Sequence, residues 1–98
     1  MDKFQSLSGN RLLFDLASRL GSLEGYLYAE KNVDKSYLPN WLLNIEREFN
    51  CLSTVVKDEI QADYLELVKK IHALLQRLYG EQDPTTAQVG GMIEALTR

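Results

Sequence analysis

Cysteine and histidine are scarce in this sequence, and each scarcity excludes a class of structure or chemistry. Cys51 is the one cysteine among 98 residues, so no disulfide can form within the chain, and a reducing compartment is the simpler expectation. The one histidine, His72, has no Glu-x-x-His or His-x-x-x-His spacing around it, so the usual pattern of metal ligands is missing. We therefore expect neither a metal ion nor another cofactor.

Long apolar runs are also missing. No stretch approaches the roughly 20 apolar residues that a membrane-spanning helix requires, and Met1–Gln5 lacks the basic and then apolar order of a signal peptide. The formal net charge of −3 disfavours binding to phosphate backbones and to anionic membrane surfaces. The sequence therefore predicts a soluble, cytoplasmic protein that binds neither nucleic acid nor membrane.

Catalytic motifs and phosphate-binding loops are absent from the sequence. His72 falls at the edge of an apolar helical arc, where contact with both the core and solvent is its ordinary role. Cys51 is expected in the middle of a helix, where nothing nearby in the sequence would activate its thiol. The 14 acidic residues do not form the pattern of a carboxylate-bridged metal pair. The expected protein is therefore not an enzyme.

Helical periodicity extends over most of the chain. A hydrophobic content of 45% and a charged content of 26% are ordinary for a globular protein, and the length suits one domain over residues 1–98. Apolar residues recur at helical spacing, without the alternation of strands. The predicted fold is all-α: an antiparallel helical bundle of three long helices plus one short C-terminal helix.

The first helix is predicted over residues 10–31, after possible capping residues at 8–10. Its apolar stripe consists of five leucines spaced three and four residues apart: Leu13, Leu16, Leu20, Leu23 and Leu27. A loop is expected at 32–35. Ser36 then becomes the predicted N-cap of the second helix, with Pro39 in its first turn.

The boundary between the second and third helices has two interpretations. The second helix has an apolar stripe made of Leu38, Leu42, Ile45, Phe49, Leu52 and Val56. Asp63 and Glu66 have the spacing of a capping box, which predicts that the third helix begins near Tyr64. No glycine or proline separates the two helices, however. One continuous helix of about 40 residues, which would require dimerisation, is therefore the alternative.

The last helix has clear start and stop signals around it. Gly80 is a good stop for the third helix, and Asp83 and Pro84 are suited to the N-cap and first position of the fourth. Its apolar face consists of Val89, Met92, Ile93 and Leu96. Two adjacent glycines, Gly90 and Gly91, each weaken a helix by ~1 kcal/mol relative to alanine. We expect this helix to be short and the least stable.

A second stripe on the first helix points away from the leucines. It consists of Phe14, Ser18, Gly21, Gly25 and Tyr28. Small residues four positions apart allow another helix to approach closely, and such a contact would compensate for the helix-weakening effect of glycine. A kink, or packing against the last helix of the same chain, is the alternative.

Two aromatic residues complete the predicted interface. Tyr37 and Trp41 flank the apolar stripe of the second helix. Tyrosine and tryptophan are favoured in binding hot spots, although completing a core is their more ordinary role in a small bundle. The sequence thus predicts a protein-interaction module that binds another protein or itself, for instance as a homodimer. The alternative is a small acidic inhibitor or immunity-type protein that blocks a larger target.

Overall fold

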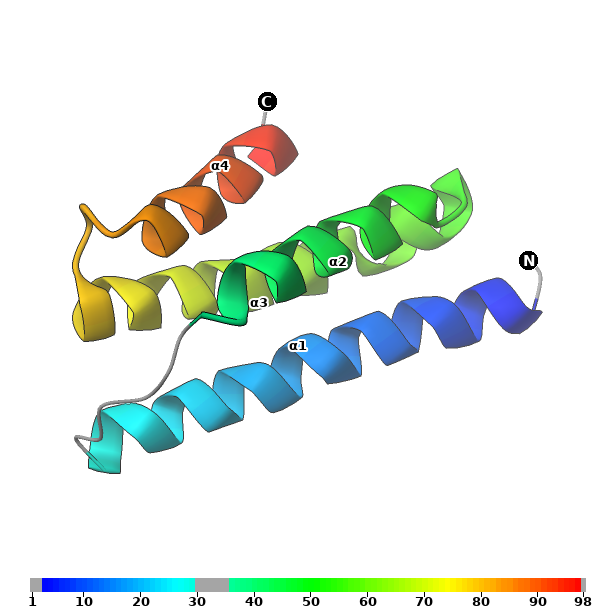
Figure 1. The fold of residues 1–98 in the computed structure, drawn as a ribbon. Coiled ribbons are helices and arrows are strands. Elements are labelled where there is room, and N and C mark those ends of the chain that lie inside the picture. Colours follow the sequence, from blue (N-terminus) through cyan, green and yellow to red (C-terminus); the bar gives the residue numbers. More distant parts are fainter. Residues whose placement is uncertain (1–2, 30–35, 98) are drawn as a thin grey trace.

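Four helices form the described part of the chain, which comprises residues 3–29 and 36–97 of a computed structural model (Figure 1). They are α1 (Lys3–Ala29), α2 (Leu38–Cys51), α3 (Thr54–Tyr79) and α4 (Pro84–Thr97), and no strand occurs among the described residues. Successive helices run in opposite directions. The predicted all-α antiparallel bundle is confirmed, but α2 is as short as α4, with 14 residues.

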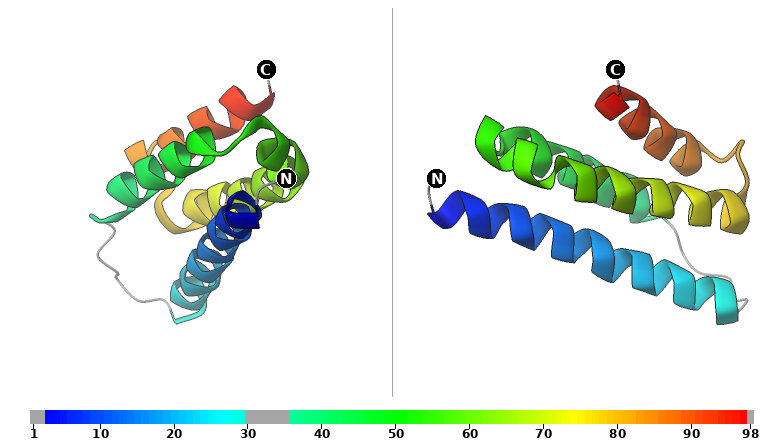
Figure 2. Two further views of the ribbon diagram at one scale, coloured as in Figure 1. Left: turned by 90° about the vertical axis from the view of Figure 1, so that its right-hand side faces the viewer. Right: turned by 180° about the vertical axis from the view of Figure 1, so that it is seen from behind.

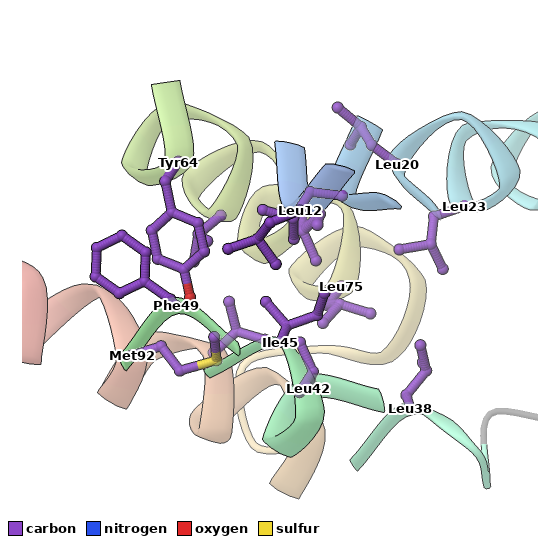
Figure 3. Close-up of a cluster of buried hydrophobic side chains, with 14 of the residues drawn as sticks. Leu12, Leu20, Leu23, Leu38, Leu42, Ile45, Phe49, Tyr64, Leu75 and Met92 are labelled. Atoms are coloured by element: carbon purple, nitrogen blue, oxygen red, sulfur yellow. The ribbon is translucent and has the colours of Figure 1, made fainter. Parts of the chain in front are cut away.

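Helices α1 and α4 pack on opposite sides of α3, and α2 packs on both α1 and α4 (Figures 1 and 2). The core fills the space among these four helices. The buried apolar side chains come from all four helices, and Figure 3 shows most of them. Each such side chain contributes roughly 1.5–3 kcal/mol when it leaves water. No helix in the described ranges is both long and apolar enough to cross a membrane.

The first helix begins earlier than predicted, at Lys3. The proposed capping residues 8–10 therefore lie inside α1, and the capping prediction is wrong. Gly9 is buried because α1 approaches α3 closely there: a Cβ atom on Gly9 would lie 2.8 Å from Cγ1 of Val56. Leu12, rather than Leu13, is buried with Leu16, Leu20 and Leu23.

Two other predictions fall outside the described residues. The loop at 32–35 lies in the range 30–35, and the side chain of Leu27 is not described either.

The expected N-cap of α2 is wrong, because Tyr37 holds that position without a side-chain cap, although a proline does occupy the first turn. The helix is held instead by its apolar stripe, in which Leu38, Leu42, Ile45 and Phe49 are buried.

The boundary between α2 and α3 lies at residues 52–53, so both the predicted break near Tyr64 and the continuous helix are wrong. Leu52 and Ser53 have extended backbones, and Oγ of Ser53 accepts a hydrogen bond of 3.3 Å from the amide of Val56. The α3 stripe then runs at helical spacing from Val56 through Ile60 and beyond. Because this stripe is unbroken at Asp63, nothing in the packing ends a helix there.

The start of α4 follows the prediction. Gly80 ends α3 with a φ of 90°, which favours glycine, and Oδ1 of Asp83 accepts a hydrogen bond of 2.9 Å from the amide of Thr85. Val89 and Met92 are buried, as expected. With 14 residues, α4 is much shorter than α3, which has 26, and it leaves part of α3 uncovered (Figure 1).

Candidate functional site

Four of the predicted interface residues lie together on the side of α1 that faces away from the core. These are Phe14, Ser18, Gly21 and Gly25, which we call the α1 outer face, and all four are exposed. A Cβ atom added to Gly21 or Gly25 would meet no neighbouring residue within 4 Å. The alternative in which these glycines pack against α4 is therefore wrong. The fifth member of the stripe, Tyr28, has a side chain outside the described ones.

Phe14 is the dominant feature of the α1 outer face, because its side chain is 73% exposed. A hollow of 430 Å³ lies on its α2 side and includes Arg11, Asp15 and Glu48 in its lining. A second hollow, of 400 Å³, lies on its α3 side and includes Glu66 and Lys70. An exposed aromatic ring with charged groups around it has the layout of a small interface, with an apolar centre and a polar rim.

Tyr37 and Trp41, by contrast, lie at the junction of α1 with α2 and are half-buried. Nη1 of Arg19 donates a hydrogen bond of 3.2 Å to the hydroxyl of Tyr37. The central carbon of the same guanidinium lies 4.8 Å from the centroid of the Tyr37 ring and 5.4 Å from that of Trp41. The rings of Tyr37 and Trp41 therefore pack against Arg19 of the same chain. They are not part of the α1 outer face.

Two nitrogen atoms in this Arg19 cluster are buried without a hydrogen-bond partner among the described residues. They are Nε of Arg19 and Nε1 of Trp41. The attraction between the guanidinium and the aromatic faces is worth roughly 0.5–2 kcal/mol, more when the cation is desolvated. We infer that stacking and one hydrogen bond, rather than a complete hydrogen-bond network, join α1 to α2 here.

A second surface feature, which sequence reasoning missed, is a groove of 610 Å³ between α2, α3 and α4. Its lining, which defines the three-helix groove, is Glu46, Phe49, Asn50, Thr54, Lys57, Asp58, Gln61, Tyr64, Met92, Ala95 and Leu96. The rings of Phe49 and Tyr64 stack in it, with centroids 4.1 Å apart and an interplanar angle of 6° (Figure 3). The groove therefore has an apolar floor and a polar rim, which is the usual layout of a binding site.

Tyr64 is the unusual residue of the groove, since its side chain is 1% exposed and its hydroxyl has no hydrogen-bond partner in the described part of the chain. Burial raises the pKa of Tyr64 well above its ordinary value, and the negative charge of Glu46 raises it further. Tyr64 is therefore a neutral phenol at physiological pH. Helical periodicity could place it in the core, but only the length of α4 determines that a groove opens beside it.

The two candidate reactive side chains, His72 and Cys51, lie against another helix and on the surface, respectively. Nε2 of His72 would lie 3.4 Å from a Cβ atom on Gly90, so the imidazole packs against the backbone of α4. Cys51 is exposed and lines a hollow with Arg11 and Glu48. In residues 3–29 and 36–97, no three His, Cys, Asp or Glu side chains gather at a spacing that could bind a metal ion.

Comparison with known protein families, with curated proteins and with solved structures found no match for this chain. Function is therefore inferred from the two surfaces described above.

Proposed function

We propose that this chain is a non-enzymatic protein-interaction module that uses the α1 outer face to bind another protein or a second copy of itself. The exposure of Phe14, at 73%, is the observation that supports this function. A phenylalanine buries 150–250 Å² when it is covered, so its ring is a strong source of binding free energy. One side of α1 buries four leucines against the rest of the chain, and the other side exposes a phenylalanine. The helix therefore has a second apolar surface, which is available to a partner.

The glycines of the same face support the proposal. Gly21 and Gly25 have open space where a side chain would be, and each costs the isolated helix ~1 kcal/mol relative to alanine. A partner that approaches the bare backbone closely would recover this cost through van der Waals contact. The α1 outer face therefore combines one protruding side chain with a flat region next to it.

A matched pair of variants tests the role of Phe14. Phe14→Ser removes the exposed apolar ring from α1, whereas Leu43→Ser removes an exposed apolar side chain from α2, where Leu43 is 43% exposed. Each tagged variant is purified from the native host and is also examined by sedimentation velocity. We expect Phe14→Ser, but not Leu43→Ser, to lose the co-purifying protein or the self-association.

A second variant tests the glycines. Gly21→Leu combined with Gly25→Leu fills open space, so it should keep or raise the thermal stability of the chain because leucine is a better helix former. The same side chains would block close approach of a partner and abolish association. Unchanged association in this double variant, together with unchanged association in Phe14→Ser, would show that the α1 outer face is not an interface.

A further inference from the structure

The three-helix groove lies where a further helix of the bundle would fit. Figures 1 and 2 show α4 ending well before the α2–α3 turn, so it covers only part of α3. The walls of the groove come from the second half of α2, the first half of α3 and the last turns of α4. A helix laid along this surface would continue the layer that α4 begins.

The polar groups of the groove favour a cation. Glu46 is half-buried and Asp58 is exposed, and neither carboxylate has an ion-pair partner within the described ranges. Nζ of Lys57 lies 5.9 Å from the centroid of the Phe49 ring and leaves both carboxylates unpaired. An occupant that brings one apolar side chain for the floor and one positive charge for the rim would match these groups.

The outer face of α1 carries this combination. Phe14 is 73% exposed, and Arg11 lies three residues before it, so both side chains project from neighbouring positions on the helix. Arg11 is exposed and forms no ion pair with the residues that the structure describes. In Figure 1, α1 and α4 lie on opposite sides of α3, so Phe14 cannot reach the groove of its own chain.

We propose that a second copy of this chain inserts Phe14 into the three-helix groove, with Arg11 beside Glu46 and Asp58. This inference rests on the proposed role of the α1 outer face and names the partner of that face. Because the two contacting surfaces differ, the contact is heterologous, and repetition of it produces a closed ring or an open chain of molecules.

Sedimentation velocity on two complementary variants tests the contact. Phe14→Glu removes the inserted ring and keeps the groove. Ala95→Arg fills the mouth of the groove from an exposed position on α4 and keeps Phe14. Each variant alone should be a monomer, whereas an equimolar mixture should form a dimer of one copy of each, because one intact surface remains on each partner.

Matched controls and one charge variant complete the test. Ala87→Arg places the same side chain at an exposed position of α4 outside the groove, and it should associate like the wild type. Arg11→Gln should weaken association about two- to fivefold, as expected for an exposed ion pair, and less so at high salt. Circular dichroism establishes that each variant remains helical.

The outcomes separate this inference from the proposed function. A wild-type chain that stays monomeric at its highest soluble concentration overturns self-association, while binding of a different protein to the α1 outer face still stands. Loss of association in Phe14→Glu but not in Ala95→Arg also overturns the groove contact and leaves the α1 outer face as an interface. A mixture of the two variants that remains monomeric likewise overturns the groove contact.

Discussion

The guanidinium of Arg19 lies over the ring of Tyr37, 4.8 Å from its centroid, and donates a hydrogen bond of 3.2 Å to the hydroxyl of the same residue. Arg19 of α1 thus contacts both the ring face and the hydroxyl of Tyr37, the residue that immediately precedes α2. This contact joins two helices whose connecting residues, 30–35, lie outside the described ranges. It also gives Tyr37 a structural role that is independent of any partner.

Substitutions at this contact separate its two components. Tyr37→Phe keeps the ring under Arg19 and removes the acceptor, which should lower the free energy of unfolding by about 0.5–1.5 kcal/mol. Arg19→Ala also removes the stacking and the packed stem, and should cost about 1–3 kcal/mol. Urea denaturation measures both. If Tyr37 belonged to a binding interface instead, Tyr37→Phe would alter association and leave stability unchanged.

Glycines on opposite sides of α1 should respond oppositely to alanine. A Cβ atom on Gly9 would lie 2.8 Å from Cγ1 of Val56, a buried and stiff side chain, whereas a Cβ atom on Gly21 has open space. Gly9→Ala should therefore lower stability by about 1–2 kcal/mol, since overpacking outweighs the gain in helix propensity. Gly21→Ala should raise it by about 0.5–1 kcal/mol. Thermal denaturation of the pair checks this, and equal shifts would contradict it.

The helix boundary at Ser53 leads to another paired prediction. Ser53→Ala removes the side-chain acceptor at the N-terminus of α3, and should lower stability by about 0.5–2 kcal/mol. Asp63→Ala changes an exposed position within the same helix, and should leave stability unchanged or raise it by ~0.5 kcal/mol. Denaturant titration compares the two. A larger loss in Asp63→Ala would restore the boundary that the capping pattern suggested.

Periodicity predicted which faces of the helices are buried, but not where the helices end. Spacing alone predicts that Leu38, Leu42 and Ile45 lie on one apolar stripe, and they are buried. The capping pattern at Asp63 was misleading, since this residue lies well inside α3 rather than at its start. Ser53, which does cap α3, follows Leu52 and carries no accompanying acidic residue three positions later.

The two surface features differ in how far the sequence could reveal them. The α1 outer face follows from positions on one helix, so the sequence could place Phe14, Gly21 and Gly25 together. The three-helix groove requires residues from α2, α3 and α4, and its existence depends on where α4 ends relative to α3. Local periodicity contains no information about that alignment, and the arrangement of Glu46 near Tyr64 was therefore not predictable.

Burial of Tyr64 makes stability sensitive to alkaline pH. The pKa of its phenol is raised above the ordinary value of 10.0 by burial and by Glu46, so the folded chain holds this proton more tightly than the unfolded chain does. The resulting stabilisation is fully present below pH 10.0 and decreases as the pH rises toward the folded-state pKa.

Tyr64→Phe isolates this effect from the other tyrosines. The variant keeps the stacking on Phe49 and removes a hydroxyl that has no hydrogen-bond partner in the described part of the chain, so its stability at neutral pH should equal or exceed that of the wild type. Above pH 10.0, the urea midpoint of the wild type should fall more steeply than that of Tyr64→Phe, whereas Tyr26→Phe, at a half-buried position of α1, should follow the wild type. Parallel curves for all three proteins would mean that Tyr64 ionises as readily in the folded chain as in water, and that the phenol is not held neutral by its burial.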